Sequence, residues 1–354
     1  MNPAKGGATA GLTYRDAGVD LDAAAAAKVR IMELAGQTLG SSVLSDQGGF
    51  GGVIDPGANS DTLLVSSTDS VGTKLRVAQA MGRHDTIGID IVNHCVNDIL
   101  PAGATPLFFL DYIGLSNFDQ TLLSQILAGL SKACGDVGCA LLGGETATLP
   151  GIYHGDDYDL VGFIVGTVQR DRLISAANTA EGDVLIGLPS SGLHTNGYSL
   201  VRKVFGIDDD PSAVNEALPG DNSRTLGDAL LQPHRSYLPL LKDNSGPGVR
   251  KEVKALAHIT GGGIFKNIPR VIANGLAAEI DVRSWQTPPL FAHIQRTGGI
   301  DDLEMFRVFN MGMGMVVVAN EADAERLLGS IDGAWRAGKL VTQTGEHRVI
   351  SKGL

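Results

Sequence analysis

Short apolar segments of two kinds alternate along most of this 354-residue chain, and glycine clusters separate them. Some are brief continuous runs typical of buried strands, whereas others repeat apolar residues at helical spacing. The pattern predicts strands over residues 63–67, 106–113, 139–142, 160–168, 183–188, 276–282 and 313–319. It predicts helices over residues 73–81, 86–100, 121–137, 198–205, 263–274, 289–296 and 321–328. This order predicts an α/β (α+β) fold in two halves, each built on a mixed sheet.

The boundary between the two halves is expected where the composition turns polar, between residues 169 and 182. A chain of this length is long for one hydrophobic core, which also favours two domains. We expect three segments: a glycine-rich N-terminal segment over 1–60, a first domain over 61–172 and a second domain over 173–354. Residues 206–224, which contain three consecutive aspartates and two prolines, are expected to form an exposed insertion.

The charge balance limits the class of partner. The chain has 28 basic and 39 acidic residues, a net charge of −11. Broad nucleic-acid binding needs clustered Lys and Arg, so we do not expect it, although a few local donors still suffice for a small anionic ligand. Three cysteines without a C-x-x-C spacing are expected to be reduced and buried.

No apolar run approaches the ~20 residues that a membrane span requires. Residues 1–13 are small and polar, and they lack the apolar stretch of a secretory signal. We therefore expect a cytoplasmic protein without a membrane partner.

The first candidate site residue is Asp69, which ends a predicted strand just before a glycine turn and a helix. Ligands in α/β folds bind at such strand ends, although an aspartate here also serves to cap the next helix. The sequence Gly72-Thr73-Lys74 lacks the upstream glycine of a P-loop, so any nucleotide must bind in another way.

A polar stripe runs along the predicted helix over 86–100. Asp90, His94, Asn97 and Asp98 are spaced so that they share one side of this helix. These are poor helix formers, and a merely solvated stripe would usually carry Lys or Glu instead. Short oxygen ligands suit Mg²⁺, so the stripe predicts a metal site.

A third carboxylate follows the predicted strand over 139–142. Glu145 comes directly after Gly143 and Gly144, which allow the backbone to approach a ligand closely. Asp69, Asp98 and Glu145 are thus expected to converge, and three such carboxylates repel one another unless a cation neutralises them.

Three glycine-rich loops are the remaining candidate binding sites. Residues 47–52 are a candidate mobile flap, or else a plain flexible linker. Residues 190–197 and 258–263 each lie between a predicted strand and a predicted helix, where backbone N–H groups are aimed at an anion. Two such loops in the second half predict a phosphorylated substrate.

Together these motifs resemble the phosphoribosylformylglycinamidine cyclo-ligase (aminoimidazole ribonucleotide synthetase) family of purine biosynthesis. The resemblance extends from Tyr14 to Arg348, and its most specific stretches are 67–75, 88–99, 106–112, 143–151, 190–203 and 258–269. It implies a superfamily that includes selenophosphate synthetase and thiamine monophosphate kinase, with two α/β domains and N-terminal strands that close a barrel across a homodimer. It further implies that the first domain binds ATP and Mg²⁺ and dimerises, and that the second binds substrate.

The resemblance assigns roles to residues of this chain. It implies that Asp69 and Asp98 bind Mg²⁺ and nucleotide phosphates, that Lys74 neutralises charge, and that His258 lines the site without binding this metal. The predicted catalytic residues are Asp69, Lys74, Asp98, Glu145 and His194, and the predicted metal ligands are Asp69, Asp98 and Glu145. The predicted ATP-binding residues are Gly48, Gly49, Phe50, Gly51, Asp69, Thr73, Lys74, Asp90 and Asn97. The predicted substrate-binding residues are Ser190, Ser191, His194, Asn196, His258, Thr260, Gly261 and Gly262.

The activity implied by the resemblance is ATP-dependent cyclisation of formylglycinamidine ribonucleotide to aminoimidazole ribonucleotide, with release of ADP and phosphate. Two alternatives remain: another ATP-dependent kinase or synthetase of the superfamily, such as a thiamine monophosphate kinase, and an inactive nucleotide-binding scaffold. The retained carboxylates count against the scaffold, which has no need to hold close negative charges.

Overall fold

A computed structural model describes residues 11–45, 49–57, 59–244, 246 and 248–354. The first half of the chain forms a five-stranded sheet in the order β1-β2-β5-β3-β4, in which only the β3–β4 pair is parallel. Its elements are α1 (Leu21–Gly36), β1 (Gly52–Ile54), β2 (Thr62–Ser70), α2 (Lys74–Met81), α3 (Ile87–Ile99), β3 (Thr105–Leu115), α4 (Gln120–Val137), β4 (Ala140–Thr148) and β5 (Tyr158–Gln169).

The second half forms a six-stranded mixed sheet in the order β13-β10-β12-β6-β11-β9, beside a small β7–β8 hairpin. Its strands are β6 (Val184–Pro189), β7 (Ala217–Leu218), β8 (Asp221–Thr225), β9 (Ala255–His258), β10 (Leu276–Asp281), β11 (Met313–Ala319), β12 (Trp335–Thr342) and β13 (Val349–Lys352). Its helices are α5 (Tyr198–Phe205), α6 (Leu226–Leu230), α7 (Leu238–Leu241), α8 (Gly263–Asn267), α9 (Pro289–Gly298), α10 (Asp302–Val308) and α11 (Glu321–Ser330). The predicted α/β fold with two mixed sheets is confirmed.

Local sequence signals set several helix ends. Asp119 accepts hydrogen bonds from two backbone N–H groups at the start of α4, and Thr225 and Asp228 form a reciprocal capping box on α6. The left-handed residues Gly82 and Gly138 end α2 and α4, with φ angles of 60° and 68°.

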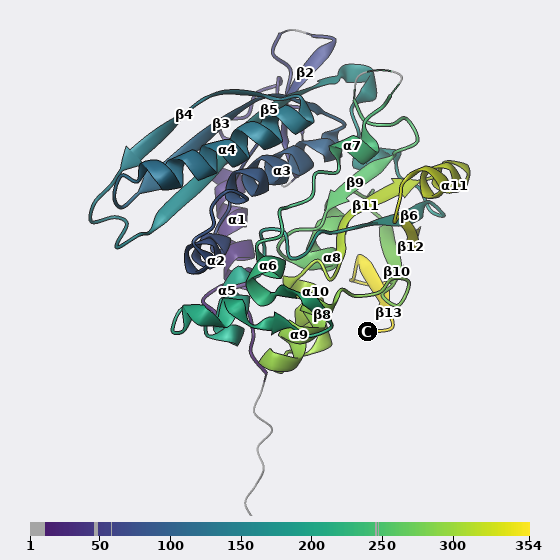
Figure 1. Cartoon of the computed structure of the whole chain (residues 1–354). Helices are drawn as coiled ribbons and strands as arrows, with labels where there is room; N and C mark the ends of the chain where they lie inside the picture. The colour runs from purple at the N-terminus through teal and green to yellow at the C-terminus, as the bar shows by residue number, and fades with distance from the viewer. Residues whose placement is uncertain (1–10, 46–48, 58, 245, 247) are drawn as a thin grey trace, which may run out of the picture.

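The two faces of the first sheet differ in how well their apolar side chains are covered. Helices α3 and α4 cover one face (Figure 1), where Phe109 and Ile164 are fully buried. On the opposite face, Phe163 is paired with Leu110 of the neighbouring strand and is 38% exposed. This second face therefore presents apolar surface to the outside of the chain.

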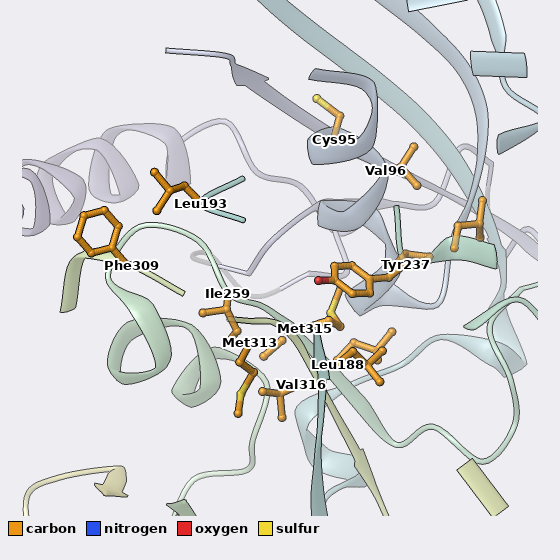
Figure 2. Close-up of a cluster of buried hydrophobic side chains, with 14 of the residues drawn as sticks. Cys95, Val96, Leu188, Leu193, Tyr237, Ile259, Phe309, Met313, Met315 and Val316 are labelled. Carbon is orange, nitrogen blue, oxygen red and sulfur yellow. The ribbon is translucent and has the colours of Figure 1, made fainter. Parts of the chain in front are cut away.

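A single hydrophobic core joins the two halves. Figure 2 shows part of it, a cluster to which Cys95 and Val96 of α3, Tyr237, and Met313 and Met315 of β11 all contribute. Gly314 of β11 packs closely, because a Cβ there would lie 2.0 Å from Tyr237 Oη. The interface between the two halves, which we call the seam, is thus packed like a protein interior.

Several sequence-based expectations need correction or remain open. The predicted helix over 263–274 is shorter, because α8 ends at Asn267 and a 3₁₀ turn over Ile268–Arg270 follows it. The expected insertion at 206–224 is only partly exposed, since Val214 and Leu218 are buried.

All three cysteines are buried and unbridged, as expected. The division at 1–60, 61–172 and 173–354 stays a prediction, and none of the described helices has the length and apolarity required to cross a bilayer.

Candidate active site

Asp69 and His94 form an ion pair where β2 meets α3. Asp69 Oδ2 lies 2.8 Å from His94 Nε2, and the Asp69 side chain is 38% exposed. Burial alone would lower the pKa of His94, but the carboxylates of Asp69 and Asp98 outweigh it and raise this pKa to about 9. Burial would likewise raise the pKa of Asp69, yet His94 holds it below its ordinary value. His94 is therefore a cation at neutral pH.

Asp98 links this pair to the second half of the chain. Its Oδ1 lies 2.8 Å from His258 Nδ1, and its Oδ2 lies 3.4 Å from Ser67 Oγ and 3.8 Å from His94 Nε2. The Asp98 side chain is 10% exposed. Asp69 and Asp98, which the sequence predicts to share a site, thus contact the same histidine nitrogen.

Lys74 is placed differently from its predicted role. Its Nζ is fully buried, lies 2.8 Å from both carboxylate oxygens of Asp90 and donates to the Gln232 carbonyl oxygen. Burial raises the pKa of Asp90 and lowers the pKa of Lys74, despite their mutual attraction. This packing directs both side chains to each other and does not favour a contact of either with ATP.

The rest of the polar stripe holds a backbone segment of the second half, residues 232–237. Asn97 donates to the Arg235 carbonyl oxygen and accepts from the Tyr237 N–H, while Asp90 accepts from the His234 N–H. Asn97 is fully buried. The stripe is therefore largely a hydrogen-bonded seam between the halves, a use that helical spacing alone does not reveal.

Glu145 does not join Asp69 and Asp98 within one chain, so the predicted convergence of three carboxylates is wrong for a single subunit. The β-sheet register pairs Asp69 with Gly162, and pairs Glu145 with Tyr112. Three strand spacings separate β2 from β4, about 14 Å. The two positions differ by one residue in register, so the side chains leave opposite faces of the sheet.

The loop over 190–197 is fixed by side-chain bonds. Ser190 Oγ bonds to Asn310 Oδ1, and Ser191 Oγ donates to the Pro233 carbonyl oxygen. His194 adopts a left-handed backbone conformation with φ of 62°, and its Nε2 accepts from the Ser191 N–H. Asn196 Nδ2 is buried and has no hydrogen-bond partner among the described residues. An unpaired buried donor of this kind is a natural contact for a ligand.

The loop over 258–263 meets the first loop. A Cβ on Gly261 would lie 3.2 Å from Asn196 Oδ1. Asn267 of α8 donates to the carbonyl oxygens of Thr260, Gly261 and Gly263, which fixes this loop. Gly262, also predicted to bind substrate, has a left-handed φ of 94°.

The described part of the predicted flap lies over Asp98 and His258. Phe50 stacks on the Arg270 guanidinium, 3.6 Å from the ring centroid, and its ring centroid is 6.4 Å from that of His258. Arg270 also donates to the Gly49 carbonyl oxygen, and a Cβ on Gly51 would lie 3.4 Å from the Asp98 carbonyl oxygen. Gly48 lies outside the described residues.

The structure thus brings Asp69, Asp98, His194, His258 and Phe50 to the seam, and separates Glu145 from them. Thr73 is at this seam too, with its Oγ1 3.1 Å from Ser199 Oγ. The predicted sets omit His94, His234 and Arg270. The four-residue spacings of His94 from Asp90 and Asp98 were a usable signal for His94, whereas no sequence signal marked His234.

Comparisons with known proteins match the whole chain. Residues 48–168 match the family model "AIR synthase related protein, N-terminal domain", and residues 180–351 match the corresponding C-terminal domain. The chain is 46% identical to a phosphoribosylformylglycinamidine cyclo-ligase of Caldicellulosiruptor bescii over 96% of this chain and 99% of that protein. It is 45% identical to the enzyme of the same name from Burkholderia cenocepacia over 99% of each.

Solved structures with low identity share the fold. Thiamine-monophosphate kinase from Stenotrophomonas maltophilia is similar with a TM-score of 0.60 and 17% identity, over 90% of this chain and 94% of that one. AaThiL, solved in complex with AMPPCP and TMP, is similar with a TM-score of 0.59 and 14% identity, over 92% and 93% of the two chains.

Proposed function

This chain belongs to the phosphoribosylformylglycinamidine cyclo-ligase family and catalyses the ATP-dependent closure of the imidazole ring in purine biosynthesis, and we propose that it does so at the seam carrying Asp69 and Asp98. The observation that carries this proposal is the network Asp69–His94–Asp98–His258, which joins the two halves beneath the Phe50 loop. A site that spans both halves can hold ATP against one and substrate against the other.

The donor set fits Mg²⁺. Asp69 is partly exposed, and within the described part of the chain Asp98 Oδ2 has only the long 3.4 Å contact with Ser67 as a hydrogen bond, so both offer carboxylate oxygens. Such hard oxygen ligands, together with substrate phosphates, are what Mg²⁺ prefers. Bound there, Mg²⁺ would neutralise charge on the transferring phosphoryl group. Glu145 would require a second subunit to approach this site.

The ring closure needs a better leaving group than an amide oxygen. Transfer of the γ-phosphoryl group of ATP to the formyl oxygen of the substrate, with loss of the adjacent N–H proton, gives an iminophosphate. The amidine nitrogen then attacks the formyl carbon and phosphate leaves. Phosphoryl transfer depends mainly on positioning and charge neutralisation, which the network supports by holding His94 as a cation beside both carboxylates.

The loops of the second half are the proposed substrate site. Asn196 carries the buried unpaired amide, and Gly261 of the next loop lies against it, so we propose that Thr260, Gly261 and Gly262 complete this site. The Ser190 and Ser191 hydroxyls bond to protein atoms, and their backbone N–H groups donate to the Gly312 carbonyl oxygen and to His194 Nε2, so we assign both residues to fixing the loop.

The chain is further proposed to form a homodimer with a second copy through the exposed face of the first sheet. Phe163, Leu110, Tyr112 and Val161 share this face and none of them is fully buried. Leu107 of β3 and Leu142 of β4 are 49% and 65% exposed. A second copy would cover this apolar surface, as the predicted barrel requires.

The test is an assay of ADP release from purified protein with ATP, Mg²⁺ and formylglycinamidine ribonucleotide, with product detected by mass. We expect ADP to form with this substrate and hardly at all without it. Thiamine monophosphate serves as the competing acceptor, and equal turnover with it would contradict the assignment.

A further inference from the structure

Four of the chain's eight histidines gather at the seam: His94, His194, His234 and His258. The rings of His194 and His234 are stacked, with centroids 3.9 Å apart. His194 and His234 are 1% exposed and His258 is 0% exposed. His234 comes from the segment before α7 and has no part in the site proposed above.

The hydrogen bonds decide which ring nitrogens hold lone pairs. A carboxylate only accepts hydrogen bonds, so His258 Nδ1 donates to Asp98 Oδ1 and its Nε2 carries the lone pair. This Nε2 lies 3.1 Å from His234 Nε2. Given that lone pair, His234 Nε2 is the donor of this hydrogen bond, and His194 Nε2 accepts from the Ser191 N–H, so ligation by these two atoms would replace both bonds. Among the residues that the structure describes, neither His194 Nδ1 nor His234 Nδ1 has a hydrogen-bond partner, although both atoms are buried. Buried polar atoms without partners call for an explanation.

We propose that His194, His234 and His258 form a binding site for a divalent transition-metal ion of the Zn²⁺ type, with Asp98 orienting His258. One ligand atom from each histidine lies within 4.8 Å of the others. Two nitrogens bound to a tetrahedral Zn²⁺ at about 2.0–2.1 Å are about 3.3 Å apart, close to the 3.1 Å between the Nε2 atoms of His234 and His258.

The surroundings of His258 match those of a metal ligand. Ligating histidines almost always donate their second ring N–H to a carboxylate or carbonyl group, which fixes the ring and its tautomer. The 2.8 Å bond from His258 Nδ1 to Asp98 is such an arrangement. Imidazole nitrogens suit Zn²⁺ rather than Mg²⁺, so the three histidines would select a different ion from the neighbouring carboxylate site, with which they share Asp98.

The charges around the cluster permit an ion. The neutral imidazole is the ligating form of histidine, and all three rings are buried away from solvent. The nearby cations Lys74 and His94 are each paired with a carboxylate, Asp90 and Asp69 respectively. The Asp98 carboxylate then remains beside the cluster to offset the charge of a bound ion.

Occupancy has a functional consequence. The three ligands come from three separate segments: the loop after β6, the segment before α7 and the end of β9. An ion would tie these segments together and would occupy His194 and His258, which are predicted to contact substrate. We therefore expect Zn²⁺ to stabilise the folded chain and to inhibit ring closure.

Metal binding is tested on the full chain without ATP or substrate, so failure here is distinct from failure of the proposed activity. The metal-free protein is titrated with Co²⁺, whose visible absorption reports tetrahedral coordination, and Zn²⁺ is then used to displace it. We expect one Co²⁺ per chain and a rise in melting temperature with Zn²⁺. No binding, or octahedral coordination only, would overturn the proposal.

His234→Gln is the decisive variant, and His347→Gln, at an exposed position, is its matched control. We expect His234→Gln to weaken Co²⁺ binding by at least ~100-fold, more than the loss of an outer-shell partner, while the control binds as the natural chain does. If His234→Gln fails to fold, His194→Asn replaces it in the same titration. Equal binding by the natural chain and by a folded ligand variant would refute the site.

Discussion

Replacing Lys74 with Met should destabilise the protein, because Lys74 and Asp90 form a buried ion pair rather than a ligand contact. The change removes the ammonium group that lies 2.8 Å from both Asp90 oxygens and leaves a carboxylate with zero exposure. Breaking a buried pair by removing one partner costs about 3–5 kcal/mol. The His234 N–H still bonds to Asp90, so we expect the lower end of this range.

The loss of stability caused by Lys74→Met should depend on pH. Burial raises the pKa of Asp90 in the folded state above its unfolded value, and without Lys74 this shift becomes larger. The folded variant then holds a proton more tightly than the unfolded chain does. Its stability therefore rises as the pH falls through the folded-state pKa of Asp90, and the variant should recover part of its loss at acidic pH.

The assay is the midpoint of unfolding in denaturant, followed by circular dichroism at neutral and acidic pH. Lys132→Met is the matched control, because Lys132 forms an exposed pair with Asp136, and removal of such a pair costs less than about 1 kcal/mol. If Lys74→Met keeps the natural midpoint and loses only activity, Lys74 acts on the ligand and the structural interpretation is wrong.

Three further variants test the seam, the exposed sheet face and the packing of β11. Asn97→Ala leaves the Tyr237 N–H and the Arg235 carbonyl group buried without their partner, so the unfolding free energy should fall by about 1–3 kcal/mol for each group left unpaired, measured by calorimetry. Phe163→Asp puts a charge on the exposed sheet face, so light scattering should detect a monomer for this variant and the proposed dimer for the natural chain; an unchanged mass would contradict the proposed interface. Gly314→Ala places a methyl group against Tyr237 and should lower the free energy of unfolding by about 1–3 kcal/mol. An unfolding midpoint equal to that of the natural chain would mean that β11 shifts freely.

Much of the fold follows from local patterns in the sequence. The bounds of α5 and β11 match their predicted ranges, because an amphipathic helix and a continuous apolar run are strong periodic signals. The predicted helix over 263–274 was too long, because apolar residues that continue past Asn267 pack in a 3₁₀ turn instead.

The site was harder to predict, because spacing identifies which side chains share a face but not what they contact. Asp90 and Asn97 share a helix face with Asp98, yet they bind the backbone of residues 234–237, more than 130 residues away. Glu145 was predicted to follow a strand, but it lies within β4, and the strand order β2-β5-β3-β4 separates it from Asp69. Strand order and the docking of the two halves are tertiary properties, and no local motif encodes them.

The central claim, that Asp98 belongs to the ATP site at the seam, is tested by measuring ADP release by Asp98→Asn against Mg²⁺ concentration. Asparagine keeps an oxygen acceptor for His258 Nδ1, so the variant should fold, and a thermal melt checks this. We predict that ADP release falls by ~100-fold or more, the size expected for losing a preorganised charge, and that the melting shift with Mg-ATP shrinks. Natural activity together with an unchanged Mg-ATP shift would remove Asp98 from the site and contradict the account.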